Sequence, residues 1–220
     1  MEQSEPASTR KRYLIAGSFD SLPVFHEVVV SILCLSQPLS ASALSSLLDI
    51  PEDTISEQLN DLRPIVDIPQ DVHEPLPLLP IKFKEFIFGP DNEYAVDPSL
   101  VHDNLATCCL RVMYNYLKPN ICGLKSPGQD RSTIPKQKIS SCIPEVLVYA
   151  CTNWVAHFRA SEPATGSTTN LLLEGYLLRW LEVMSLIGRA TESITMLQTL
   201  RTMALASFDP HKAWYILTLV

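Results

Sequence analysis

The sequence lacks the features that mark membrane-spanning, secreted and zinc-binding proteins. Its most apolar segment, Val24–Leu35, contains His26 and Glu27 and is only about half of the ~20 residues that a membrane helix needs. No apolar stretch follows the basic run Arg10–Arg12, so we expect no signal peptide. The six cysteines form no CxxC motif and no Cys/His cluster of zinc spacing, which favours reduced, buried thiols. A cytoplasmic protein without a membrane partner is expected.

A surplus of positive charge is also missing. The 17 Lys and Arg residues are outnumbered by 24 Asp and Glu residues, for a net charge of −7. Such a chain has no general attraction to nucleic acid, and binding would need a local basic patch. Apolar residues make up 46 % and charged residues 19 %, which indicates packed structure or a surface built for a partner.

Motifs for catalysis are absent as well. The chain contains no GxSxG and no HExxH, and its five histidines are scattered. His102 and His157 lie among apolar neighbours on predicted helices, where packing is their expected role. The segment Gly123–Gly128 has the glycine spacing of a P-loop, but Gln129 and Asp130 stand where Lys and Ser/Thr are required. We therefore expect no catalytic residue, no cofactor-binding residue and no metal ligand, and infer that the protein is not an enzyme.

Residues 22–90 show the pattern of a winged-helix domain, after a lead-in over residues 1–21 that we expect to be disordered. Three helices are predicted: one from Val24 that Pro38 ends, one capped by Ser40, and one from Pro51 to Pro64. The apolar runs 65–68 and 76–79 flank a polar turn and predict a two-stranded wing, which prolines confine to sheet edges. A short amphipathic helix follows, with Phe83, Phe86, Ile87 and Phe88 as its apolar residues, and ends at Gly89.

The rest of the chain is predicted to be helical. Residues 91–158 form a helical domain with a helix opened by Asp97, a long loop over 118–143, and a helix that begins at Pro144. A linker is expected at 159–169, and 170–220 then form a helical hairpin broken at Gly188. Its first helix is apolar nearly all round, which predicts burial between two neighbours. Since the chain ends in an apolar stretch from Trp214 without a cap, we expect truncation at the C-terminus. The predicted fold class is mainly α: a winged-helix-like domain with a small β-hairpin wing, followed by helical hairpins of the helical-repeat type.

The predicted third helix argues against DNA as a partner. A recognition helix needs Arg, Lys, Asn or Gln at its exposed positions. This helix instead carries four carboxylates, and Arg63 lies only at its end. The carboxylates, which would repel a phosphate surface, are Glu52, Asp53, Glu57 and Asp61.

Several strings, taken in order over about residues 24 to 205, resemble the region behind the NACHT nucleotide-binding domain of fungal NLR-like signalling ATPases of the STAND class. The first blocks are Pro38–Ser40 with Leu44–Leu48 and Leu59–Leu62, then Phe83–Ile87 and Val96–Pro98 with His102. The sharpest are Asn120–Leu124, Tyr149–His157 in the form YACxxWxxH, and Trp180–Gly188.

The resemblance implies a relay that packs against the nucleotide-binding domain and passes ligand sensing to it. The NACHT domain itself is absent, so nucleotide binding is not implied here. Relatives usually carry a His before the Phe of the short helix, where this chain has Pro80. A contact of that His with nucleotide would therefore be lost.

The leading hypothesis is a non-catalytic regulatory and protein-interaction module, a fragment or split relative of such a protein. Its expected partner is a protein, either a NACHT-type ATPase domain or another helical or repeat domain. The oligomeric state stays open. One alternative is a free-standing helical-repeat adaptor, and another is a winged-helix DNA-binding regulator, which the acidic third helix disfavours.

Overall fold

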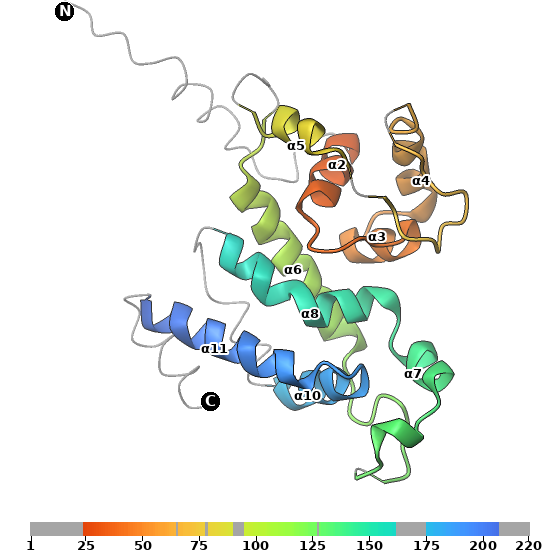
Figure 1. Cartoon of the computed structure of the whole chain (residues 1–220), viewed down its shortest axis with the longest axis vertical. Coiled ribbons are helices and arrows are strands. Elements are labelled where there is room, and N and C mark those ends of the chain that lie inside the picture. Colours follow the sequence, from red (N-terminus) through yellow and green to blue (C-terminus); the bar gives the residue numbers. More distant parts are fainter. Residues whose placement is uncertain are drawn as a thin grey trace, which may run out of the picture.

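The chain is mainly helical (Figure 1). The computed structural model describes residues 24–64, 66–77, 79–89, 95–126, 128–161 and 175–206, with side chains up to residue 203. The expected lead-in, residues 162–169 of the expected linker and the C-terminal stretch from residue 207 lie outside these ranges. Within them the elements are α2 (Val24–Cys34), α3 (Ala41–Leu48), α4 (Glu52–Asn60), α5 (Ile81–Ile87), α6 (Pro98–Tyr116), the 3-10 helix η2 (Arg131–Thr133), α7 (Lys136–Cys142), α8 (Glu145–Ala160), α10 (Leu177–Leu186) and α11 (Ala190–Ala206).

The second and third predicted helices, α3 and α4, begin where their start signals indicate. The Ser40 hydroxyl accepts a hydrogen bond from the Ala43 amide at the start of α3, which satisfies one of the free N–H groups of a helix N-terminus. Helix α4 begins directly after Pro51, and Glu52 and Asp53 occupy its first turn, where the helix dipole favours negative charge. Local sequence therefore determines these boundaries.

The predicted β-hairpin wing is wrong for the part of it that the structure describes. No described residue of the runs 65–68 and 76–79 lies in a strand, and the β-type pairing recorded here is an isolated bridge between Ser40 and Pro75. The segment instead donates from Leu76 N to Leu39 O (2.9 Å) and accepts at Val72 O from Ser42 N (3.0 Å). The described residues of the two runs, 66–68 with 76, 77 and 79, therefore do not pair with each other, because Pro69, Pro75, Pro77 and Pro80 lack the N–H groups that a ladder needs.

Helices α6 and α8 form the centre of the fold (Figure 1), and their packing is the most extensive among the described helices. Helix α6 begins at the cap Asp97, whose carboxylate accepts from Ser99 N, and α8 begins after Pro144. Helices α2 and α3 pack against one part of this pair, and α10 and α11 pack against α8. A single hydrophobic cluster contains residues from all of these helices.

The predicted loop over residues 118–143 is partly helical, so that prediction is corrected. It contains η2 and the seven-residue helix α7. Asp130 caps η2 by accepting from Ser132 N, and Pro135 precedes α7. Ile134 and Ile143, one on each side of α7, are buried. These two apolar anchors stabilise a helix that is too short to be evident from periodicity.

The α10–α11 hairpin has the predicted glycine break. Arg189 N donates to Met184 O and Gly188 N donates to Ser185 O, and Gly188 has a φ of 79°; this is the Schellman ending of a helix. Helix α10 is less buried than predicted, since Leu178 is 80 % exposed. No helix in the described ranges is long and apolar enough to cross a bilayer.

Candidate functional site

The turn at Asn120–Leu124 is attached to α10 by a carboxylate. Glu182 accepts from the backbone amides of Asn120 and Ile121, both at 3.1 Å. Asn120 has a φ of 51°, and its side-chain amide bonds both the N–H and the carbonyl of Leu124. The block Asn120–Leu124 and the block Trp180–Gly188 therefore form one contact, although about sixty positions separate them.

The same loop is attached to the end of α10 by Arg131. Its Nε donates to Leu186 O at 2.7 Å, which satisfies one of the free carbonyls of the helix C-terminus. The guanidinium lies against Gly188, where a Cβ would come within 2.8 Å of it. Glycine at this position therefore serves both the turn and the close approach of Arg131.

Two tryptophans join α8 to α10. Trp180 and Trp154 are fully buried, and their rings meet edge to face at 6.0 Å between centroids. Trp180 Nε1 donates to Cys151 O at 2.9 Å. Each of the three sharpest sequence blocks thus supplies side chains that hold another part of the chain in place.

A hydrogen-bonded chain, here called the histidine network, connects three parts of the fold; Tyr149 and His157 are buried, His102 is partly buried and Ser36 is exposed. It consists of Ser36, Tyr149, His157 and His102. The Ser36 amide donates to the Tyr149 hydroxyl (3.2 Å), that hydroxyl meets His157 Nε2 (2.7 Å), and His157 Nδ1 meets His102 Nδ1 (2.9 Å). The network therefore runs from α6 through α8 to the segment between α2 and α3, and its histidines pack as predicted.

The network favours uncharged histidines. Burial and, to a lesser extent, the neighbouring His102 together lower the pKa of His157 to about 3. Burial also lowers the pKa of His102, with a contribution from the Lys84 ammonium on α5. A short Nδ1–Nδ1 contact requires one ring to donate and the other to accept, which is consistent with two neutral rings.

Helix α5 lies beside this network and presents apolar side chains to solvent. Ile81 is 72 % exposed and Phe86 is 64 % exposed, while Ile87 is buried and Phe83 is half-buried. The apolar residues of this predicted amphipathic helix are therefore divided between a buried side and an exposed side. We call Ile81, Lys82, Lys84, Glu85 and Phe86 the α5 surface. Exposed large apolar groups next to charged ones are typical of contact sites.

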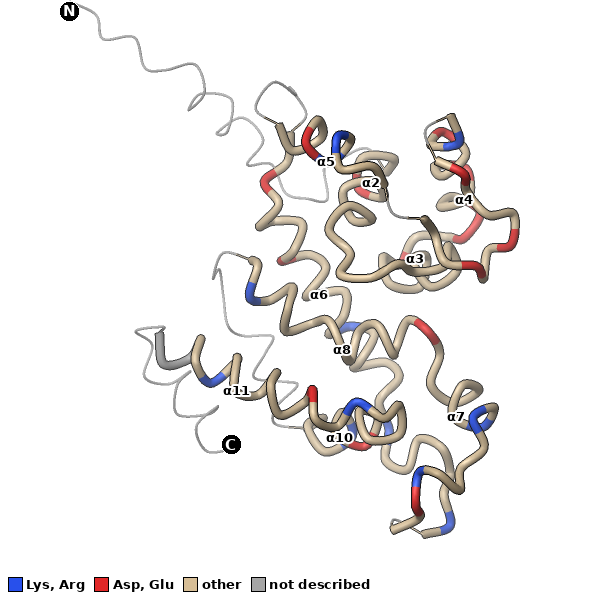
Figure 2. The backbone as a smooth tube through the Cα atoms, in the orientation of Figure 1, with Lys and Arg blue, Asp and Glu red and all other residues tan. Residues whose placement is uncertain are grey.

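Helix α4 is acidic on its exposed side, as predicted. Glu52, Asp53, Glu57 and Asp61 are all exposed, and acidic residues follow one another along α4 and the segment after it (Figure 2). This charge is unsuited to a phosphate backbone.

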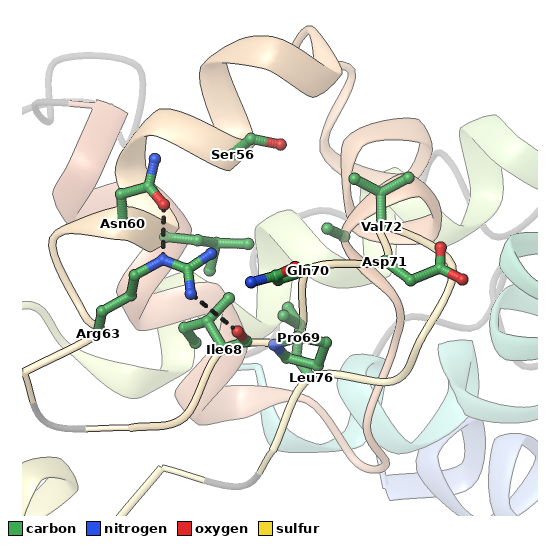
Figure 3. Close-up of a pocket in the computed structure, with 11 residues that line it drawn as sticks. Ser56, Asn60, Arg63, Ile68, Pro69, Gln70, Asp71, Val72 and Leu76 are labelled. Carbon is green, nitrogen blue, oxygen red and sulfur yellow. Dashed lines mark hydrogen bonds between the residues drawn. The ribbon is translucent and has the colours of Figure 1, made fainter.

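A small pocket separates α4 from the segment that follows it, residues 66–77, here called the proline-rich segment (Figure 3). Arg63 lies at its side, donating to Asn60 Oδ1 at 2.8 Å and to Ile68 O at 3.1 Å. The volume of the pocket, about 70 Å³, is well below the roughly 300–1,000 Å³ of pockets for small-molecule ligands. The pocket therefore suits a few water molecules rather than a metabolite.

The structure leaves the P-loop-like segment without its context. Gly123, with a φ of 57°, follows a turn rather than a strand. All six cysteines are free, and five of them are buried, as predicted. Among the described residues, no group of three or more His, Cys, Asp or Glu side chains is placed to hold a metal ion.

Sequence reasoning missed the pairing partners rather than the residues. Glu182, Trp180, Tyr149 and His157 all stand in the quoted blocks, but their contacts cross long sequence separations. Ser36 carries no signal, because it acts through its backbone amide.

No protein-family model, no curated protein and no solved structure matches this chain.

Proposed function

We propose that the chain is a non-catalytic regulatory and protein-interaction module, related to the relay region behind the NACHT domain of fungal NLR-like ATPases. Its docking site is the α5 surface, and its partner is a NACHT-type ATPase domain. The observation that carries the proposal is the exposure of Ile81 and Phe86 on a helix of seven residues. The sequence resemblance supplies the class of partner.

The histidine network supplies a physical route for such a relay. Lys84 of the α5 surface acts electrostatically on His102, and His102 is bonded through His157 and Tyr149 to Ser36. A partner that covers α5 would desolvate Lys84 and change the field at His102. That change would reach the α2–α3 connection without any movement of the α6–α8 pair.

Binding to a purified NACHT domain from a fungal protein that carries the same post-NACHT blocks tests the proposal. Burying an Ile or Phe side chain contributes about 1.5–3 kcal/mol, so Phe86→Glu and Ile81→Glu should each weaken binding about tenfold or more. Ile194→Glu on α11, where the native side chain is 57 % exposed, is the matched control. Isothermal titration with ADP and with ATP measures the affinities. The proposal would be contradicted if the chain bound neither the ADP-loaded nor the ATP-loaded NACHT domain, or if all variants bound equally well.

The helical-repeat adaptor is a second candidate, and one observation favours it. Leu178 and Ile194 on the α10–α11 hairpin are 80 % and 57 % exposed, as on the last unit of a stack that another unit covers. For an adaptor the order of sensitivity is reversed: Ile194→Glu abolishes partner binding and Phe86→Glu leaves it intact. The DNA-binding alternative would need salt-sensitive gel shifts on duplex DNA, which the acidic face of α4 opposes.

A further inference from the structure

Two of the six cysteines, Cys122 and Cys142, are neighbours in space and differ from the other four in their surroundings. Lys138, one turn before Cys142 on α7, donates to the carbonyl of Gly123, the residue after Cys122, at 3.3 Å, and the two thiols interact with each other. Cys122 lies in the turn before Gly123, and Cys142 is the last residue of α7. Cys142 is partly exposed, whereas Cys109 and Cys151 are fully buried in the centre of the fold. An oxidant in solution can therefore reach this pair first.

The backbone around the pair is held on both sides. The turn is fixed by Glu182 through the amides of Asn120 and Ile121, and Lys138 of α7 donates from Nζ to Gly123 O at 3.3 Å. Burial, the neighbouring Cys142 thiol and the Glu182 carboxylate raise the pKa of Cys122 to about 11, and the Lys138 ammonium opposes this rise only in part, so Cys122 stays a thiol. The two sulfur atoms are therefore kept in reach of each other by contacts that do not involve them.

We propose that Cys122 and Cys142 form a reversible disulfide and are a redox modification site whose oxidant is a peroxide. The Cys142 thiolate attacks hydrogen peroxide, which forms a sulfenic acid at Cys142 and releases hydroxide. The Cys122 sulfur then attacks the sulfenic sulfur, and its proton leaves with the sulfenic hydroxyl as water. Two thiols are oxidised and one peroxide is reduced to two waters. A dithiol reductant restores both thiols by exchange.

The disulfide would join α7 covalently to a turn that already holds α10. In the reduced chain, α7 reaches that turn through the Lys138 contact and the thiol pair, both of which break easily. Oxidation would make the attachment permanent until reduction, and would restrict the unfolded chain by closing a loop. The oxidation state of the Cys122–Cys142 pair would therefore control how firmly α7 is attached to the α10–α11 hairpin.

Thiol titration and peptide mapping of the whole chain test the site. The reduced protein is exposed to a small excess of hydrogen peroxide, then unfolded and titrated. We expect free thiols to fall from six to four, the peptides of Cys122 and Cys142 to be linked, and dithiothreitol to restore all six. The oxidised protein should also melt at a higher temperature than the reduced one. These measurements on the native sequence do not depend on any variant being folded.

Variants identify the roles of the two sulfurs. Cys142→Ser should keep its remaining five thiols under the same exposure, and Cys122→Ser should accumulate a sulfenic acid at Cys142 that dimedone traps. Cys109→Ser, the control at a fully buried thiol, should still lose two. The proposal is overturned if the native chain keeps six thiols, if the disulfide maps to another pair, or if Cys142 is overoxidised equally fast with and without Cys122.

Discussion

Gly188 is required for two reasons, its positive φ and the close approach of the Arg131 side chain. Gly188→Ala places a methyl group at a φ of 79° and within 2.8 Å of the Arg131 guanidinium. Arg131 can move only by giving up its bond to Leu186 O. We expect unfolding free energy to fall by about 2–4 kcal/mol, of which about 1–2 kcal/mol is left-handed strain and the remainder a lost charged hydrogen bond.

Gly123→Ala is the matched control for this substitution. Gly123 also has a positive φ, of 57°, but an added Cβ there meets nothing within 4 Å. It should therefore show the strain alone, about 1–2 kcal/mol. Urea denaturation measures both variants, and equal losses would show that the contact with Arg131 contributes nothing.

The lowered pKa of His157 predicts that the protein loses stability in acid. Its pKa is about 3 in the folded chain and 6.5 in the unfolded chain, so below pH 6.5 the unfolded state binds a proton that the folded state does not. Stability is therefore full above pH 6.5 and decreases as the pH falls toward 3. The contribution approaches about 1.4 kcal/mol per pH unit. His102, with its pKa lowered in the same direction, adds to this slope.

Comparing His157→Gln with the native chain isolates the contribution of His157 to the pH dependence of stability. The variant loses the titrating group and should show a flatter dependence of unfolding free energy on pH between 6.5 and 4, even if it is less stable at pH 7. Chemical denaturation at a series of pH values gives the slopes. Identical slopes would mean that His157 titrates alike in the two states.

At the scale of elements, Ser40 connects the start of α3 to the start of α8. Its hydroxyl caps α3 and also meets Glu145 Oε2 at 2.5 Å, and its amide donates to Glu145 Oε1 at 3.2 Å. Ser40→Ala should cost more than the roughly 1 kcal/mol of an ordinary cap, because a carboxylate also loses a partner.

A double-mutant cycle of Ser40→Ala with Glu145→Gln measures how much the contact between Ser40 and Glu145 contributes to the free energy of unfolding. Because the two side chains are in contact, their effects should be non-additive by about 0.5–3 kcal/mol. Additive losses would show that Ser40 acts only as a cap. Asp97→Ala, which removes a cap within α6 alone, provides the reference value.

The same scale shows why some elements could be predicted from the sequence and others could not. Helix α2 has apolar periodicity, and α3, α4, α6 and α8 also have start signals at their first residues or just before them, so local chemistry determines them. The wing failed because two extended runs do not specify their pairing partner, and the proline-rich segment bonds to residues 39–42 instead. Helix α7 was missed because its stability comes from anchors buried against other elements.

For the candidate site, the residue types were evident but the geometry was not. The blocks containing Glu182, Trp180 and His157 stand out in the sequence, yet their partners lie 62, 29 and 55 positions away. Only the packing of α6, α8 and α10 brings them together. The exposure of Phe86 could not be predicted either, because a seven-residue helix has too few turns to define a buried face.

At the scale of the whole molecule, one hydrophobic cluster runs from α2 to α11. Helix α3 packs against both α6 and α8, across the predicted boundary at residue 90. We therefore expect residues 24–206 to unfold in one cooperative transition. In a Trp214→Phe background, the fluorescence of Trp154 and Trp180 reports α8 and α10, and far-ultraviolet circular dichroism reports all helices. Coincident curves are expected, and separated midpoints would indicate independent units.

The proline-rich segment after α4 has a consequence for the protein at high concentration. Extended backbone with free N–H and C=O groups is a template for pairing with another chain, which leads to edge-to-edge aggregation. Here Pro69, Pro75, Pro77 and Pro80 interrupt every possible ladder, and Asp67, Asp71 and Glu74 are exposed beside them. The residues that prevent an internal wing therefore also prevent an intermolecular one, so this surface can stay extended without seeding fibres.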